Sequence, residues 1–317
     1  MRYAMLFPGQ GSQAVGMLAG LAAPEIEATF REAGDVLGYD MQGLVTAGPA
    51  EDLNRTERTQ PALLAAGIGV WRAWQNQGAP GPAAFAGHSL GEYTALVAAG
   101  SLGFADALRL VELRGRLMQA AVPAGTGGMA AVIGLDDDKA GHLCRAYPGK
   151  EVLEPVNFNS PGQVVVAGQT AALEWLEAHG KAHGARMVMR LPVSVPSHCS
   201  LMRGAADQLS AELARTTIHE PAIPVLHNLD GQPRREPAAI RQALTEQLYR
   251  PVQWTRTVQQ LAGQGIHLFL ECGPGKVLSG LNKRIDKSLQ AVGLEDAEGM
   301  ARAKALVEGP EAGSTAT

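Results

Sequence analysis

The stretch Gly87-His88-Ser89-Leu90-Gly91 decides the fold, because a Gly-x-Ser-x-Gly pentapeptide between an apolar run and a helical run places a serine on a sharp turn. Residues 83–86 before it are short and apolar, as in a buried strand, and residues 92–99 after it favour helix. The flanking glycines allow a tight turn, and free N–H groups at a helix start can hold an oxyanion. The pattern predicts a nucleophile elbow that presents Ser89; the alternative is a glycine-rich turn with an incidental serine.

The composition is that of an ordinary globular protein. The chain has 317 residues, of which 46% are hydrophobic and 18% charged, enough for one large domain or two moderate ones. Its formal net charge of −4 provides no overall attraction to nucleic acid or to an anionic membrane. Pro8-Gly9 interrupts the first apolar run, so no leader is expected, and no uncharged run is long enough to span a bilayer. We therefore expect a cytoplasmic protein without a nucleic-acid or membrane partner.

The cysteines and histidines do not form a metal-binding pattern. Cys144, Cys199 and Cys272 are far apart and odd in number, which favours reduced thiols. His179 and His183 have helical spacing, but no third ligand is evident. No phosphate-binding Gly-x-x-x-x-Gly-Lys-Ser/Thr loop occurs, and the glycine pair near the N-terminus lacks the third glycine and downstream acid of a dinucleotide site. We expect neither a metal nor a cofactor.

Strands and helices alternate along the first part of the chain, which predicts the α/β class. The expected elements are a strand at 3–7, a helix from Pro61 to about Gln77, the elbow strand and helix, and a helix at 104–121. The segment Gly125-Thr126-Gly127-Gly128, after Pro123, has the composition of a flexible joint. Residues 1–123 are therefore expected to be the first part of a large α/β domain.

Beyond the joint the expected elements become shorter. They are a strand at 129–134, a helix at 137–147, paired strands at 152–158 and 163–167, a helix at 170–179 and a strand at 186–191. This β-α-β-β-α-β order is the ferredoxin-like unit and predicts an inserted subdomain over 124–193. Residues 194–294 are expected to return to the large domain, with strands near 224–228 and 267–271 among helices. The tail, 295–317, is predicted to be a frayed helix or a disordered end without a catalytic part.

A nucleophilic serine needs a base, and His198 is the best candidate. It follows Val195-Pro196-Ser197, a rigid segment that could open a helix with Ser197 as its N-cap, and it lies at a domain joint. His88 is adjacent to Ser89, but neighbouring side chains in an elbow diverge, so it is expected to pack or to orient the turn. A capping or core role for His198 remains the alternative. No acid occupies an obvious triad position, so a backbone carbonyl or an amide is left open as the third member.

Arg114 is the arginine expected to point inward. Its neighbours three and four residues away in the helix are apolar: Leu110, Val111, Leu117 and Met118. A buried guanidinium is costly without an anionic partner, and its planar fork matches a carboxylate. The functional interpretation is a substrate carboxylate; the alternatives are a buried ion pair with an Asp or Glu, or a side chain that extends outward to solvent.

Several motifs, in order along the chain from about Tyr3 to Leu294, together resemble the malonyl-CoA:acyl carrier protein transacylases of type II fatty acid synthesis. These motifs are Pro8-Gly9-Gln10-Gly11-Ser12-Gln13, the elbow extended to Glu92-Tyr93, Arg114, Asn157-Phe158-Asn159-Ser160-Pro161-Gly162-Gln163, Val195-Pro196-Ser197-His198 and Glu271-Cys272-Gly273-Pro274-Gly275. The resemblance implies an α/β-hydrolase-like large domain with a ferredoxin-like insert, Ser89 as nucleophile, His198 as base and Arg114 as the malonyl carboxylate site. It also implies an oxyanion hole from the backbone N–H groups of Gln10 and Leu90, and orientation of His198 by the backbone carbonyl of Gln247.

The implied reaction moves a malonyl group from CoA to Ser89 and then to the phosphopantetheine thiol of acyl carrier protein. A monomer is expected from the family. Because such carrier proteins are acidic, a local basic docking site is expected, and Lys276, Lys283, Arg284 and Lys287 are its candidates; a solvated helix face is the alternative. Two other activities stay open, a free-standing acyltransferase of a polyketide pathway and a serine acyl-thioester hydrolase.

Overall fold

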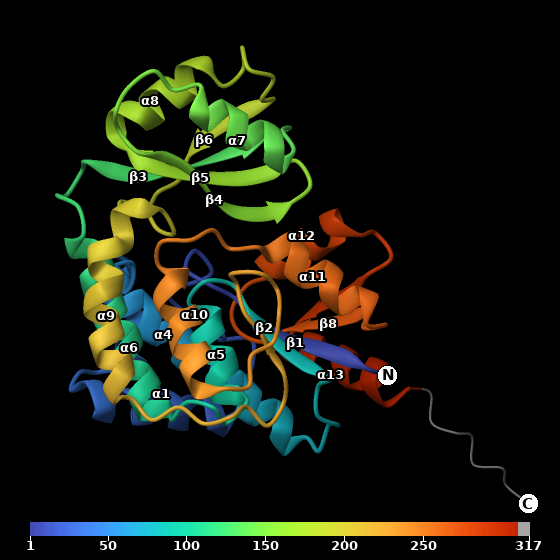
Figure 1. Ribbon diagram of the computed structural model, residues 1–317. Helices are drawn as coiled ribbons and strands as arrows, with labels where there is room; N and C mark the ends of the chain where they lie inside the picture. Colours follow the sequence, from blue (N-terminus) through green and yellow to red (C-terminus); the bar gives the residue numbers. More distant parts are fainter. Residues whose placement is uncertain (310–317) are drawn as a thin grey trace, which may run out of the picture.

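The computed structural model describes residues 1–309, which form a large α/β domain and a smaller α/β unit placed over one end of it (Figure 1). Two sheets account for all the strands of this part. The larger is parallel, in the order β7 (Val225–Leu226), β2 (Ala84–Gly87), β1 (Tyr3–Phe7), β8 (Leu268–Glu271) and β9 (Gln290–Gly293). The smaller is antiparallel, in the order β4 (Leu153–Ser160), β5 (Gln163–Gln169), β3 (Gly127–Ile133) and β6 (Met187–Arg190).

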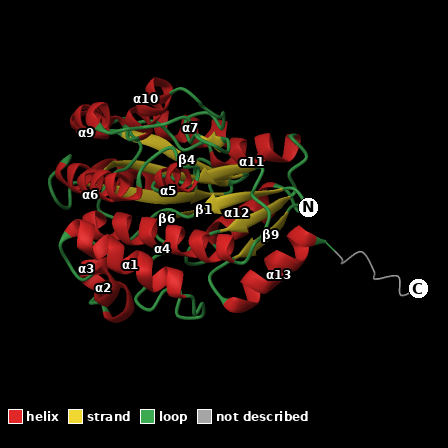
Figure 2. Cartoon of the chain, turned by 90° about the horizontal axis from the view of Figure 1, so that it is seen from below, coloured by secondary structure: helices red, strands yellow, loops and turns green. Residues whose placement is uncertain are grey.

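Helices cover both faces of the parallel sheet, because successive side chains of its strands point to opposite sides. On β1, Tyr3, Met5 and Phe7 enter one core, whereas Ala4 and Leu6 enter another. The first core is shared with α1 (Pro24–Leu37), α2 (Met41–Ala47), α3 (Ala50–Leu53), α4 (Thr56–Asn76), α5 (Gly91–Ala98), α6 (Phe104–Ala120), α9 (Arg203–Arg215), α10 (Pro237–Gln247) and α13 (Ala297–Glu308). The second is shared with α11 (Trp254–Gly263) and α12 (Val277–Ile285). Figure 2 shows α4 and α11 on opposite sides of the strands.

The smaller unit has the ferredoxin-like order. Its chain runs β3, α7 (Asp137–Arg145), β4, β5, α8 (Thr170–His179) and β6, and the two helices pack on one face of its sheet around a core of its own. The strands β4 and β5 meet in a hairpin whose turn holds Gly162 at a φ of 76°, a left-handed conformation that glycine adopts without strain. The α/β class, with a parallel sheet and a separate small antiparallel sheet, is the fold predicted from the sequence.

Three expectations about individual elements were wrong. Helix α4 begins at Thr56 and contains Pro61, because the missing proline N–H removes only one intrahelical hydrogen bond and the helix is buried along most of its length. Ser197 is not an N-cap: His198 has a φ of 63°, which cannot start a helix, so a short 3-10 turn (Ser200–Met202) precedes α9.

The third error concerns the tail. Residues 297–308 form α13, whose Met300, Ala303 and Val307 are buried in the first core, so this segment is neither frayed nor disordered. The expectation for 310–317 lies outside the described residues. No helix within 1–309 combines the length and the apolar character needed to cross a bilayer.

Candidate active site

The elbow around Ser89 is held by close contact between two neighbouring parallel strands. Phe7 pairs with Gly87, so the chain turns away from β1 and from β2 at the same edge of the sheet. A Cβ on Gly91 would lie 2.1 Å from the carbonyl oxygen of Phe7, and one on Gly87 would lie 1.9 Å from the carbonyl carbon of Gly91. Ser89 itself has a φ of 51°, in the left-handed region. Only glycines at these two positions let the turn close and present the serine.

Ser89, His198 and Gln247 form a hydrogen-bonded series. Ser89 Oγ lies 2.7 Å from His198 Nε2, and His198 Nδ1 lies 2.6 Å from the backbone oxygen of Gln247. A carbonyl oxygen only accepts, so Nδ1 carries the ring proton and donates a hydrogen bond to the Gln247 carbonyl. Nε2 is then free to accept the proton of the serine hydroxyl.

The surroundings of His198 keep its ring neutral. The pKa of His198 is lowered to about 3, mainly by burial and also by the positive charge of Arg114, while the hydrogen bond to the Gln247 carbonyl opposes the shift. A neutral imidazole at neutral pH is the form that can take a proton. The electrostatics therefore suit a base.

Arg114 lies on α6 beside the serine and is only 1% exposed. Its Nη1 donates to Gln60 Oε1 at 2.8 Å, and its Nη2 donates to Gln247 Oε1 at 3.0 Å and to Ser89 Oγ at 3.2 Å. Its Nε has no hydrogen-bond partner, and no carboxylate among residues 1–309 forms an ion pair with it. Neither the internal ion pair nor the solvent-directed side chain is therefore observed, and the guanidinium faces Ser89 with its charge unpaired.

Gln10 and Leu90 line the same cavity as Ser89, Arg114 and His198; its volume is about 390 Å³. Gln10 lies in the turn after β1, and Leu90 directly precedes α5. Neither backbone N–H donates a hydrogen bond to any residue within 1–309. Both are thus available to an oxygen beside Ser89.

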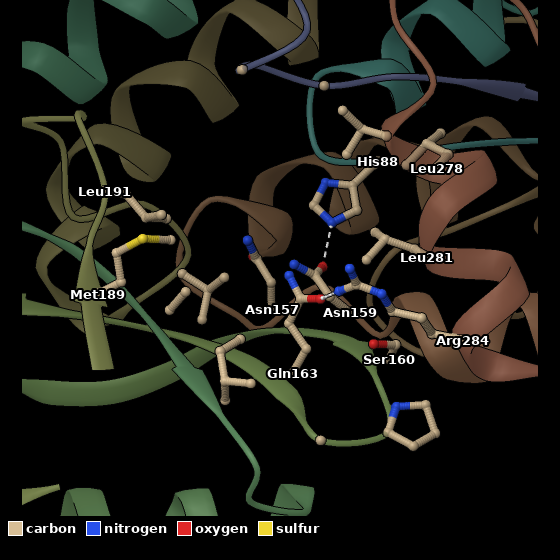
Figure 3. Close-up of a pocket in the computed structure, with 18 of the residues that line it drawn as sticks. His88, Asn157, Asn159, Ser160, Gln163, Met189, Leu191, Leu278, Leu281 and Arg284 are labelled. Carbon is tan, nitrogen blue, oxygen red and sulfur yellow. Dashed lines mark hydrogen bonds between the residues drawn. The ribbon is translucent and has the colours of Figure 1, made fainter. Parts of the chain in front are cut away.

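A second cavity, of about 700 Å³, continues from the first toward the small sheet and α12. The two share Gln10, Gly11, His88, Asn157 and Leu191 in their linings. Figure 3 shows Met189 and Leu191 on one side and Leu278, Leu281 and Arg284 on the other. The two volumes together form a passage from the molecular surface to Ser89.

Comparison with known proteins identifies the family. The family model for the acyl transferase domain matches residues 4–305. The malonyl CoA-acyl carrier protein transacylase of Salmonella typhimurium is 56% identical over 297 residues, covering 93% of this chain and 96% of that protein. The chain belongs to the malonyl CoA-acyl carrier protein transacylase family.

Two solved structures extend the likeness to the fold of this transacylase family. An acyl carrier protein S-malonyltransferase from Vibrio cholerae is 53% identical with a TM-score of 0.93, covering 96% of this chain and 100% of that one. A malonyl-transacylase solved in complex with its type II PKS acyl-carrier protein is 51% identical with a TM-score of 0.94, covering 96% and 99% of the two chains.

Sequence reasoning missed three site residues of this transacylase family member. Gln60 accepts from Arg114, and Asn228 accepts from the Ser89 N–H at 2.7 Å while donating to the Gly87 carbonyl at 2.6 Å. The third is Glu92, whose carboxylate accepts from the Asn228 N–H and from Gln247 Nε2. A polar residue within two positions of the end of a buried strand, at the carboxyl edge of the sheet, was an available signal for Asn228. Gln60, inside an apolar helix, carried none.

The basic cluster of the transacylase chain is smaller than expected. Lys276 lies 3.0 Å from Glu295 and 3.4 Å from Asp296, so its charge is already balanced. Arg284 donates to Gln163 and lines the larger cavity. Lys283 and Lys287 are exposed at the end of α12. Of the expected cluster, Arg284, Lys283 and Lys287 therefore keep exposed positive charge, and Arg186, also exposed, lines the larger cavity as well.

Proposed function

We propose that this chain transfers a malonyl group from CoA to the phosphopantetheine thiol of an acyl carrier protein, for fatty acid chain elongation, through a malonyl-Ser89 intermediate. In this proposal Ser89 is the nucleophile, His198 the base and Arg114 the carboxylate site. The N–H groups of Gln10 and Leu90 form the oxyanion hole, and the backbone carbonyl of Gln247 orients His198.

The unpaired charge of Arg114 is the observation that carries the proposal. The guanidinium is buried, its two side-chain acceptors besides Ser89 are neutral amides, and Nη2 lies 3.2 Å from the nucleophilic oxygen. An acyl group with a carboxylate a few atoms from its carbonyl would neutralise this charge by a bidentate contact. A malonyl group has this shape, whereas an unbranched alkanoyl group offers Arg114 nothing.

In the first half-reaction Ser89 Oγ attacks the thioester carbonyl carbon while His198 Nε2 takes the hydroxyl proton. The oxyanion that forms accepts hydrogen bonds from the two free N–H groups. The carbon–sulfur bond then breaks, and CoA leaves with the proton from His198.

In the second half-reaction the phosphopantetheine thiol gives its proton to His198 as its sulfur attacks the ester carbonyl. The bond to Ser89 Oγ breaks, and the serine oxygen recovers the proton. Every proton is exchanged through His198, so these steps use no cofactor, and malonyl-CoA is a substrate. All the groups named come from one chain, which supports action as a monomer.

The structure supports the other activities less well. A hydrolase of simple acyl thioesters has no use for a buried cation beside its nucleophile. A role in a polyketide pathway is favoured by one observation, the 51% identity to a transacylase that was solved with a type II PKS carrier protein. Both alternatives predict the same acyl-serine and differ in its acceptor. With the three cysteines described as free thiols, we place the proposed reaction in the cytoplasm.

Intact mass after brief mixing with malonyl-CoA tests the proposal, with Ser89→Ala as control. We expect one malonyl group on the wild type and none on the variant, and its transfer when a holo acyl carrier protein is added. Free malonate and CoA without an adduct would mean that water is the acceptor, and would replace the transferase by a hydrolase. Comparing carrier proteins from fatty acid and polyketide pathways in the second step distinguishes the two transferase roles.

A further inference from the structure

A buried carboxylate lies directly behind the elbow and takes no part in the steps above. Glu92, in the first turn of α5, is 0% exposed. Its Oε1 lies 2.7 Å from His227 Nδ1, and its Oε2 accepts from the Asn228 N–H at 2.9 Å and from Gln247 Nε2 at 2.9 Å. A carboxylate accepts and does not donate, so all three neighbours are matched to its ionised form.

Gln247 connects this carboxylate to both candidate catalytic groups. Its Nε2 also donates to the Ser89 carbonyl at 3.0 Å, while its Oε1 accepts from Arg114 and its backbone oxygen accepts from His198. An amide turned over by 180° would present its NH₂ group to the guanidinium, where donor would face donor. The two acceptors on the Nε2 side, Glu92 and the Ser89 carbonyl, therefore select the orientation that Arg114 requires.

We propose that Glu92 is a positioning residue that acts through Gln247, fixing the amide that holds Arg114 and the backbone oxygen that holds His198 in line with Ser89. A catalytic triad has an acid next to its histidine. Here Gln247 occupies that position, and the carboxylate of Glu92 lies behind Gln247. The inference rests on the proposed function, because it assigns Glu92 a task in that same site.

A carboxylate suits this task better than its amide. In Glu92→Gln, one oxygen becomes an NH₂ group, which cannot face the Asn228 N–H or Gln247 Nε2, because both only donate. It can face His227 if the imidazole moves its proton to Nε2 and accepts at Nδ1. The shape is then kept, but the hydrogen bonds to Asn228 and Gln247 lose their ionised acceptor, and the one negative charge of the network is lost.

The test measures the rate at which a fluorophosphonate probe labels Ser89, read by intact mass, since this rate reports on the Ser89–His198 pair whatever the acyl substrate. We expect Glu92→Gln to lower the labelling rate and the kcat of malonyl transfer by about 10- to 100-fold, as for a lost hydrogen bond to a charged group. The KM for malonyl-CoA should rise as well, because Arg114 loses its fixed acceptor. Wild-type labelling and wild-type KM in the variant would overturn the inference.

Glu271→Gln is the matched control. Glu271 is also a buried carboxylate, 1% exposed, but it accepts from the backbone N–H groups of Leu278 and Ser279 at the start of α12. We expect its replacement to lower the melting temperature at least as much as Glu92→Gln does, while the labelling rate stays within about twofold of wild type. Equal losses of labelling rate in the two variants would make Glu92 merely structural and overturn the inference.

Gln247→Met, which keeps the shape and removes the amide, tests the route. We expect it to lower the labelling rate at least as far as Glu92→Gln does, and we expect Glu92→Gln to add at most about twofold in its background. If the losses of labelling rate in the two single variants multiplied in the double variant, action through Gln247 would be overturned. A wild-type labelling rate in Gln247→Met by itself would overturn it as well. The second criterion applies even if Glu92→Gln does not fold. Malonyl loading of the wild type is scored separately; its absence would refute the proposed function and leave the labelling comparison intact.

Discussion

The two walls of the passage to Ser89 differ in how their side chains are held. The large-domain wall carries Arg114 and His198, which are at most 2% exposed and joined to Ser89 by hydrogen bonds, with the buried Gln247 bonded to all three behind them. The small-sheet wall carries Met187 and Met189, which are 42% and 49% exposed. A wall of interlocked polar groups tolerates little change, whereas a wall of exposed flexible side chains can be altered at small cost. We therefore assign the proposed chemistry to the first wall and the shape of the route to Ser89 to the second.

The small sheet is fastened to the large domain along one strand. On β4, the Phe158 N–H donates to the Val252 carbonyl at 3.0 Å, and the Val252 N–H donates to the Val156 carbonyl at 2.8 Å. His88 of the elbow lies 2.8 Å, ring nitrogen to amide oxygen, from Asn159 at the end of the same strand (Figure 3). Contacts along β4 therefore fix the position of the small sheet relative to the elbow. Met187 and Met189 lie on β6, at the opposite edge of that sheet, so mutations can alter the two walls separately.

The largest effect is expected from glycines of the elbow. An alanine Cβ at Gly91 would meet the Phe7 carbonyl at 2.1 Å, so Gly91→Ala should lower the free energy of unfolding by about 3 kcal/mol or more. Gly162→Ala, in the small-sheet hairpin, has open space around its Cβ and only the left-handed φ to overcome, so it should lose about 1 kcal/mol. Urea denaturation of both variants measures the difference. Equal losses of unfolding free energy in the two variants would mean that the elbow is no less tolerant of substitution than the small-sheet hairpin, and would contradict this comparison.

Arg114→Ala tests whether the unpaired cation selects the acyl group. Malonyl loading of Ser89 should slow by about 100-fold or more, as expected when one partner of a buried charge pair is removed, while acetyl loading from acetyl-CoA should change much less. The two loading rates are measured by rapid quench and intact mass. Parallel losses with both donors would show that Arg114 supports the fold of the site without recognising a carboxylate.

The pH dependence of loading reports on the buried histidine. Only neutral His198 can accept the proton, so activity falls as pH falls through its pKa, and burial lowers that pKa to about 3. The kcat/KM for malonyl-CoA should stay level from pH 8 down to pH 5, below the value of about 6.5 at which an unperturbed histidine titrates. Because the Arg114 charge also lowers the pKa of His198, Arg114→Ala should move the acid limb to higher pH. A wild-type midpoint near pH 6.5 would contradict this account.

The smallest effect is expected at the rim of the passage. Lys283→Glu with Lys287→Glu should raise the KM for acyl carrier protein about two- to tenfold and leave that for malonyl-CoA unchanged, because rim charges mainly steer encounter. Lys181→Glu, at an exposed lysine just after α8 that lines neither cavity, is the matched control and should change neither constant. The two constants come from initial rates at varied carrier protein and varied malonyl-CoA. An equal rise in both would show that these lysines serve the substrate passage and are not a docking surface.

The strands and the elbow were predictable because local rules govern them. The short, wholly apolar run of β1, the glycines around Ser89 and the β-α-β-β-α-β order of the small unit can all be recognised from local patterns. The start of α4 was missed because a proline was taken as a first-turn residue, whereas burial of the whole helix outweighs its one lost hydrogen bond. The packing of α13 was missed because its Ala- and Glu-rich composition does not show that Met300, Ala303 and Val307 face the core.

By itself, the sequence determined the α/β class, the family and the three side chains that merit attention, Ser89, His198 and Arg114. Only the tertiary structure decided how they meet: which oxygen holds the histidine, which amides surround the guanidinium, and that Glu92 lies behind them. The reason is distance along the chain, since Gln247 is separated from Glu92 by 155 positions and local propensity does not encode such a contact. The parallel sheet brings these segments to one edge, and hydrogen-bond matching in a buried site then leaves them a single arrangement.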